Sequence, residues 1–251
     1  MQSTPYKSFR VLLIWVSALT IALGFMESAV VVYLREIYYP QGFDFPLQPM
    51  DIHLAITEII REAATVVILF AIGNIAGRHF SEKFAWFLFS FAVWDLFYYV
   101  FLKALLNWPA SFMTWDVLFL IPVTWTGPVI TPVIVSFTMI LMAAIIFYFS
   151  YTDTGEKKII IKLREWLLLI SGSIVLILGF TWDYLVFLIH SMKIRKEMTG
   201  NAPTPLSDLL YQYVPDHFNW LLYAAGEGII LLGITFFFKR CRKEYKHEKK
   251  P

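Results

Sequence analysis

Six acidic side chains lie inside stretches that otherwise have the composition of membrane-spanning helices: Glu27, Glu58, Glu62, Asp95, Asp183 and Glu227. An ionised carboxylate at the centre of a bilayer helix costs roughly 2.5–3.5 kcal/mol, so six unpaired, dry carboxylates would cost about 15–20 kcal/mol. Acids in that setting face one another, a water-filled cavity or bound cations. We therefore expect them to mark a site that binds protons or a ligand.

Helical spacing gives these acids polar neighbours. Glu58 and Glu62 are four residues apart and share a face with Arg61, so one guanidinium is expected to bridge both carboxylates. Asp95 is followed by two tyrosines that can hydrogen-bond it or a ligand. The predicted ligand- or proton-binding residues are Glu27, Glu58, Arg61, Glu62, Asp95, Tyr98, Tyr99, Asp183 and Glu227.

The dipeptide Trp-Asp occurs at Trp94-Asp95, Trp115-Asp116 and Trp182-Asp183. The first and third copies continue with similar aromatic residues and would run in the same direction through the membrane. An internal duplication of a helical hairpin produces such a pattern in some transporters, and coincidence in a chain with nine Trp explains it equally well. A duplication would place Asp95 and Asp183 in equivalent positions.

Three functional readings fit the acids. The first is binding or transport of a small cationic or polar solute, with protonation of the carboxylates as the coupling step. The second is an intramembrane enzyme that uses the same carboxylates for acid–base or metal-assisted chemistry. The third is a non-catalytic subunit in which acids pair with bases, Glu27 with Arg61 and Asp95 with Lys103. Three cations on that side, at Arg35, Arg61 and Lys103, are too few to pair six acids.

Metal and cofactor signals are weak. His53, His190 and His217 fall at the predicted outer ends of helices and are the only candidate metal ligands we identify among the histidines. The di-iron pattern Glu-x-x-His is replaced by Glu58-x-x-Arg61, and a cation beside the acids disfavours a divalent ion. The zincin, phosphate-loop and serine-hydrolase motifs are missing. We therefore predict no metal site, and the identity of any cofactor stays open.

The composition requires a membrane environment. Hydrophobic residues make up 58% of the 251 and charged residues 16%, and the mean hydropathy is +0.62. A soluble domain is about 45–50% apolar and about 25% charged. The net charge of +2 gives no reason to expect a nucleic-acid partner, and the single Cys241 cannot form an internal disulfide. The lipid bilayer is the expected surroundings of the whole chain, and a small-molecule or cation ligand is its expected partner.

The elements that must position the acids are six transmembrane helices, since about 20 apolar residues cross the hydrocarbon. We expect one all-α membrane domain, residues 1–251, whose spans are approximately Val11–Leu34, His53–Ala76, Phe84–Leu106, Pro132–Tyr151, Trp166–His190 and Phe218–Phe238. The fourth span carries no charge and is expected to be peripheral and lipid-facing. The apolar Pro/Trp-rich stretch 108–132 is too broken by proline to span, and is expected to be interfacial or re-entrant.

Lys and Arg gather in the loops and tail on one side of these spans, which predicts that both termini are cytoplasmic. Residues 239–251 form a basic cytoplasmic tail, and the acid-lined cavity is expected to open to the outer face. Six helices are few for alternating access within one protomer, so a homodimer or a partner subunit is a further expectation. Gly73 and Gly77 suit helix packing, more naturally inside the chain than between copies.

Overall fold

The computed structural model describes residues 5–151, 158–197 and 212–248. In these residues six helices are long and apolar enough to cross a membrane: α1 (Pro5–Tyr38), α2 (Ile52–Ala76), α3 (Phe80–Leu106), α4 (Ile130–Tyr151), α5 (Leu163–Glu197) and α7 (Trp220–Glu248). The chain is a multi-pass helical membrane protein, as its sequence predicts. Each predicted span falls within one helix, except that the last begins two residues before α7.

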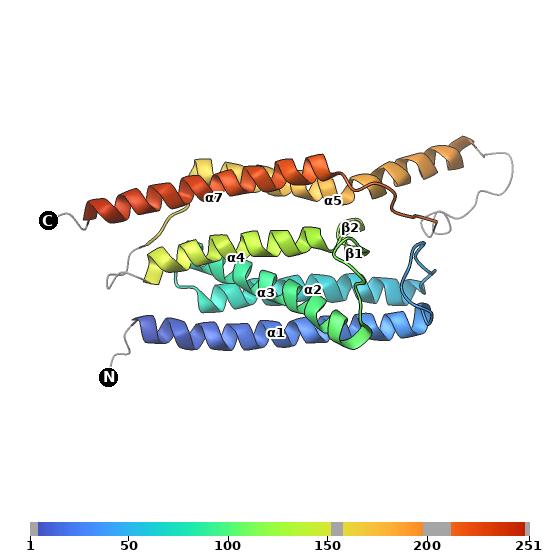
Figure 1. Ribbon diagram of the computed structural model, residues 1–251, viewed down its shortest axis with the longest axis horizontal. Helices are drawn as coiled ribbons and strands as arrows, with labels where there is room; N and C mark the ends of the chain where they lie inside the picture. The colour runs from blue at the N-terminus through green and yellow to red at the C-terminus, as the bar shows by residue number, and fades with distance from the viewer. Residues whose placement is uncertain (1–4, 152–157, 198–211, 249–251) are drawn as a thin grey trace.

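The helices form two groups (Figure 1). Helix α3 packs against α1, α2 and α4, while α5 and α7 pack on each other and meet the rest through α4 and the β-strands. The α5–α7 contact is tight because two glycines face each other: a Cβ at Gly172 would lie 2.8 Å from the carbonyl oxygen of Gly226. Gly73 similarly packs against the backbone of Lys83 on α3, so the predicted internal use of this glycine is confirmed.

Helix α4 is central, and the prediction that it is peripheral and lipid-facing is wrong. It lies between α3 and α7 (Figure 1), and its Ala143 and Ile146 are fully buried. Absence of charge does not distinguish a helix that faces lipid from one that faces other apolar helices, since both environments are hydrocarbon. Small and hydroxyl-bearing residues on two sides of α4 meet its neighbours.

The Pro/Trp-rich stretch contains the two strands found in the described residues. Strands β1 (Trp115–Phe119) and β2 (Trp125–Pro128) pair antiparallel, with Trp115 opposite Pro128 and a register irregularity between Val117 and Phe119. Pro122 lies in the turn between the strands, where it removes no ladder hydrogen bond. An interfacial or re-entrant position for this stretch remains a prediction.

The start of α1 and the end of α7 lie at one end of the bundle (Figure 1). The loop 39–51 and the β-strands lie at the other, which we call the hairpin end. Termini at one end agree with an even number of crossings, and the assignment of that end to the cytoplasm remains a prediction. Much of the predicted basic tail continues α7 as far as Glu248, and residues 249–251 lie outside the described residues.

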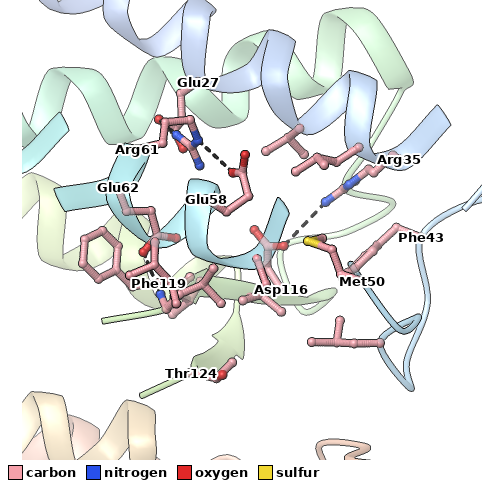
Figure 2. Close-up of a pocket in the computed structure, with 18 of the residues that line it drawn as sticks. Glu27, Arg35, Phe43, Met50, Glu58, Arg61, Glu62, Asp116, Phe119 and Thr124 are labelled. Atoms are coloured by element: carbon pink, nitrogen blue, oxygen red, sulfur yellow. Dashed lines mark hydrogen bonds and ion pairs between the residues drawn. The ribbon is translucent and has the colours of Figure 1, made fainter. Parts of the chain in front are cut away.

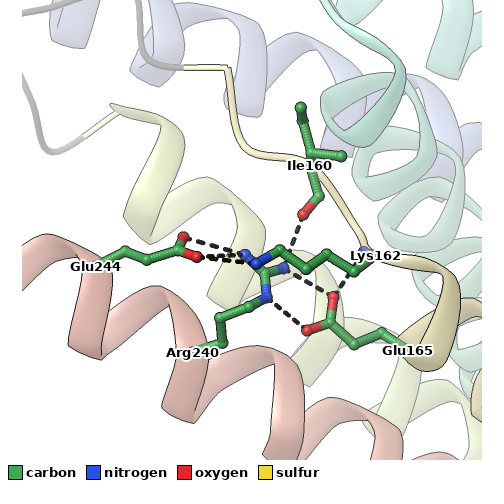
Figure 3. Close-up of polar contacts among 5 residues, drawn as sticks. All are labelled: Ile160, Lys162, Glu165, Arg240 and Glu244. Atoms are coloured by element: carbon green, nitrogen blue, oxygen red, sulfur yellow. Dashed lines mark hydrogen bonds and ion pairs between the residues drawn. The ribbon is translucent and has the colours of Figure 1, made fainter.

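A polar cluster joins α5 to α7 near the termini (Figure 3). The Arg240 guanidinium donates to both carboxylate oxygens of Glu165 at 2.7 Å and to the carbonyl of Ile160 at 2.7 Å. Glu244 accepts from the same guanidinium at 3.1 Å. Glu165 is almost fully buried, so this bidentate pair compensates a carboxylate that would otherwise be costly.

Candidate functional site

A cavity of about 480 Å³ lies at the hairpin end between α1, α2, α3, β1 and the loop 39–51 (Figure 2). This volume is within the range of small-molecule sites. Its charged lining residues come from four elements: Glu27, Arg35, Glu58, Arg61, Glu62, Asp95 and Asp116. Of the nine residues predicted for the site, seven line this cavity: Glu27, Glu58, Arg61, Glu62, Asp95, Tyr98 and Tyr99.

Arg61 ties α1 to α2 beside the cavity. One of its terminal nitrogens lies 2.5 Å from Glu27 Oε2, and its Nε donates to Glu58 Oε2 at 2.8 Å. The predicted Glu27–Arg61 pair is therefore confirmed. Of the predicted bridge from Arg61 to Glu58 and Glu62, the contact to Glu58 is confirmed and the contact to Glu62 is wrong. Helix α1 supplies the second carboxylate, which spacing along α2 alone cannot reveal.

Glu62 and Asp95 are held by uncharged donors. The backbone N–H of Leu120, just after β1, donates to Glu62 Oε2 at 2.9 Å. The Ser136 hydroxyl on α4 donates to Asp95 Oδ2 at 2.8 Å. Throughout the described ranges, no Lys or Arg nitrogen lies within 4.0 Å of either carboxylate. These two acids are the carboxyl groups of the cavity that lack a basic partner among the described residues.

The predicted Asp95–Lys103 pair is wrong. The Lys103 ammonium donates instead to the carbonyls of Asn107 at 3.3 Å and Pro109 at 3.0 Å. The last carbonyls of a helix have no intrahelical partner and attract a nearby cation. Lys103 thus caps the C-terminal end of α3. Asp95 therefore has no basic partner among the described residues.

A second charged pair lies toward the loop 39–51. The Arg35 guanidinium is 3.5 Å from Asp116 Oδ1, and it lies over the rings of Phe43 and Trp108 at 4.4 and 3.9 Å from their centroids. Tyr99 donates its hydroxyl to Asp116 Oδ2 at 3.3 Å. Burial raises the pKa of the Asp116 carboxyl to about 6, although Arg35, Tyr99 and the Val117 N–H all act to lower it.

Sequence reasoning missed Asp116 as a site residue because it lies in a stretch expected to be interfacial. The sequence did contain a pointer to Asp116, because this residue is the Asp of the middle Trp-Asp dipeptide. Its partner Arg35 is one of the three outer cations counted in the sequence. Contact between residues 35 and 116 depends on how the β-strands fold onto the helix ends. Neither helical spacing nor composition encodes that contact.

Two predicted site residues lie apart from the cavity. Asp183 on α5 accepts a hydrogen bond at 2.8 Å from the hydroxyl of Tyr213, which also contacts Thr126 Oγ1 at 2.8 Å. Burial raises the pKa of Tyr213, and Asp183 raises it further, whereas Thr126 lowers it. Asp183 thus serves this contact, whereas Asp95 faces the cavity; their equivalence through a duplicated hairpin remains a hypothesis.

Glu227 lies between α7 and α4. The Thr138 hydroxyl on α4 donates to its Oε1. Its Oε2 is buried and has no hydrogen-bond partner among the described residues. This carboxyl is therefore separated from the cavity acids by the body of α4.

The histidines do not converge. His53 and His190 are exposed, and His217 Nδ1 lies 3.1 Å from the exposed Asp216. Among the residues that the structure describes, no group of three His, Cys, Asp or Glu side chains is arranged to hold a metal ion.

No protein-family model, characterised protein or solved structure matches this chain. Inference about its function therefore starts from the cavity and its charges.

Proposed function

We propose that this membrane protein binds a small organic cation in the cavity at the hairpin end. The observation that carries the proposal is a charge imbalance. Five carboxylates and two guanidinium groups line the cavity; Arg61 contacts Glu27 and Glu58 at 2.5 and 2.8 Å, whereas Arg35 lies 3.5 Å from Asp116. Glu62 and Asp95 have no basic partner among the described residues and Asp116 has only this more distant one, so a bound cation would compensate carboxylates that are costly to bury without a partner.

The uncharged walls also suit an organic cation. Trp94, Tyr98, Tyr99 and Phe119 contribute aromatic surface to the cavity. The face of an aromatic ring attracts a cation that has been stripped of part of its water. Glu62 and Asp95 are the proposed charged contacts, and the rings are the proposed contacts for the rest of the ligand.

Transport is the proposed outcome of binding. The basic loops and tail favour a cytoplasmic location of the terminal end, so the cavity is proposed to receive its solute from the opposite face. Proton uptake by Glu62 and Asp95 would remove the charges that hold the cation and release it. Carboxylate protonation is thus the proposed coupling step.

An intramembrane enzyme is the second candidate, and one observation favours it. Asp116 has a pKa of about 6 and accepts a hydrogen bond from Tyr99 beside the cavity. A carboxyl whose pKa is close to neutrality is suited to general acid–base work. Conversion of a bound compound, rather than its unchanged release, would identify this activity.

Binding of butylamine and tetramethylammonium to protein in lipid nanodiscs, followed by calorimetry, tests the proposal. Glu62→Gln and Asp95→Asn are expected to weaken binding by about 10- to 150-fold each, because a charged contact contributes about 1.5–3 kcal/mol. Glu36→Gln is the matched control: Glu36 is exposed on the same end of α1 and does not line the cavity.

Equal affinity in all four proteins, or no binding at all, would contradict the cation site. Flux of the bound amine into proteoliposomes under a pH gradient then separates a transporter from a receptor or subunit. A flux that is the same with and without the pH gradient would contradict carboxylate protonation as the coupling step.

A further inference from the structure

The cavity has two carboxylate positions at opposite ends of strand β1. Asp116 is the second residue of β1, and Glu62 is hydrogen-bonded to the N–H of Leu120, immediately after the strand. An extended strand rises about 3.3 Å per residue, so the four residues from Asp116 to Leu120 span at most about 13 Å. The irregularity between Val117 and Phe119 shortens this span. The backbone positions to which the two carboxylates belong or bind are thus roughly 10–13 Å apart, and we take this as the approximate separation of the carboxylates.

Helix α1 gives an independent measure of the same separation. Glu27 belongs to the Arg61 cluster next to Glu62, and Arg35 contacts Asp116. Eight residues of α-helix rise about 12 Å from Glu27 to Arg35. Figure 2 shows the same order, with Asp116 between Glu62 and Arg35.

One wall of the cavity is apolar: Val31 and Leu34 on α1 and Ala55 and Ile59 on α2 line it. Glu58, which lies between Ala55 and Ile59 on α2, also lines the cavity, but its carboxylate already pairs with Arg61. Methylene groups of a ligand would bury apolar surface against Val31, Leu34, Ala55 and Ile59.

Both end carboxylates can accept a further cation. Glu62 has no basic partner within 4.0 Å in the described part of the chain. Asp116 is almost fully buried, yet Arg35 is 3.5 Å away and the Tyr99 hydroxyl is 3.3 Å away. Charge-assisted hydrogen bonds are usually about 2.7–2.9 Å long. The guanidinium also lies over the rings of Phe43 and Trp108, and the third donor near Asp116 is the uncharged N–H of Val117, so no close charge-assisted hydrogen bond holds this carboxylate.

We propose that the ligand is a linear α,ω-diamine, whose two ammonium groups bind Glu62 and Asp116 while its methylene chain lies against the apolar wall. This inference rests on the proposed function and narrows its ligand class. With the carboxylates at that separation, an ammonium nitrogen about 2.8 Å inside each of them leaves roughly 4.5–7.5 Å between the nitrogens. An extended chain advances about 1.25 Å per bond, so three to five methylenes fit, with 1,4-diaminobutane in the middle.

The test is a chain-length series of diamines with two to eight methylenes, measured by calorimetry on the full chain in nanodiscs, with butylamine as the singly charged reference. Affinity is expected to peak at three to five methylenes and to exceed that of butylamine about tenfold. Glu62→Gln and Asp116→Asn should each remove this advantage, while Glu36→Gln keeps it. A cooperative thermal transition shows that each variant is folded.

The outcomes separate this inference from the proposed function. Binding of butylamine and diamines with equal affinity, or no dependence on length, overturns the diamine assignment and leaves the cation site standing. Failure of every amine to bind the wild-type protein overturns both. A length optimum that survives Asp116→Asn overturns the assignment of the second ammonium to that carboxylate.

Discussion

Ser136 and Thr138, two residues apart on α4, donate hydrogen bonds to carboxyls on different helices: Asp95 on α3 at 2.8 Å, and Glu227 on α7. Two residues along a helix turn the side-chain direction by about 200°, so the two hydroxyls point to opposite sides. Helix α4 therefore separates a cavity acid from an acid buried between the two helix groups. Glu227 thus lies outside the cavity that four of the six intramembrane acids line.

Binding of 1,4-diaminobutane is expected to strengthen as the pH rises through about 6. The pKa of Asp116 is raised to about 6 by burial, so this carboxyl is neutral below that pH and charged above it. Arg35 and Tyr99 are its charged and titratable neighbours, and Asp95 lies close enough to interact with it. Affinities measured between pH 5 and 7.5 should show this step in the wild type. Persistence of the same step in Asp116→Asn would contradict it.

Protonation of Asp116 also predicts a pH-dependent stability. The folded carboxyl, with a pKa near 6, binds its proton more tightly than the unfolded chain, whose usual value is 3.8. This contribution to stability is fully present below pH 3.8 and is lost as the pH rises through about 6. Thermal unfolding midpoints of wild type and Asp116→Asn, compared from pH 4.5 to 7.5, check the sign. A wild-type advantage that grows with pH would disprove it.

Arg61→Gln is expected to lower the free energy of unfolding by about 3–5 kcal/mol, because it leaves the carboxylates of Glu27 and Glu58 without their cation. The triple variant Glu27→Gln/Glu58→Gln/Arg61→Gln should recover most of this loss, since no charge remains unpaired. Denaturant unfolding in detergent measures both. Lys103→Gln is the control, because Lys103 contacts only loop carbonyls among the contacts described above. A triple variant no more stable than Arg61→Gln would refute the pairing.

Glu227 is expected to react with dicyclohexylcarbodiimide at neutral pH. It is buried, its Oε2 has no partner in the described residues, and no Lys or Arg there forms an ion pair with it, so an ionised form would be uncompensated. The apolar reagent adds to protonated carboxyls. Peptide mass spectrometry should find the adduct on Glu227 and lose it in Glu227→Gln. The exposed, arginine-paired Glu244 is the internal control. Labelling of Glu244 alone would be the contrary result.

Arg240→Lys is expected to destabilise the protein by about 2 kcal/mol, because an ammonium cannot reproduce the two parallel hydrogen bonds to the buried Glu165. Lys162→Gln removes only the exposed contact to Glu244 at 3.3 Å and should change stability by less than about 1 kcal/mol. Unfolding midpoints of the two variants give the comparison. Equal effects would argue against the bidentate pair as the main contact in Figure 3.

The sequence by itself determined the helical membrane class and the six spans, because the length of an apolar run and the thickness of a bilayer are both local quantities. It also identified the costly acids and two correct partners of Arg61, which are Glu27 and, from helical spacing, Glu58. Seven of the nine predicted site residues line one cavity. Their role in binding remains a proposal.

Only the tertiary structure decided which acids share a space. Helix rotation and the folding of β1 onto the helix ends bring Asp116 to Arg35 and Leu120 to Glu62, across separations of 81 and 58 residues. The same packing places α4 at the centre and turns Asp183 and Glu227 away from the cavity. Hydropathy cannot encode these contacts, because lipid and the apolar side of a neighbouring helix are equivalent solvents for a hydrophobic face.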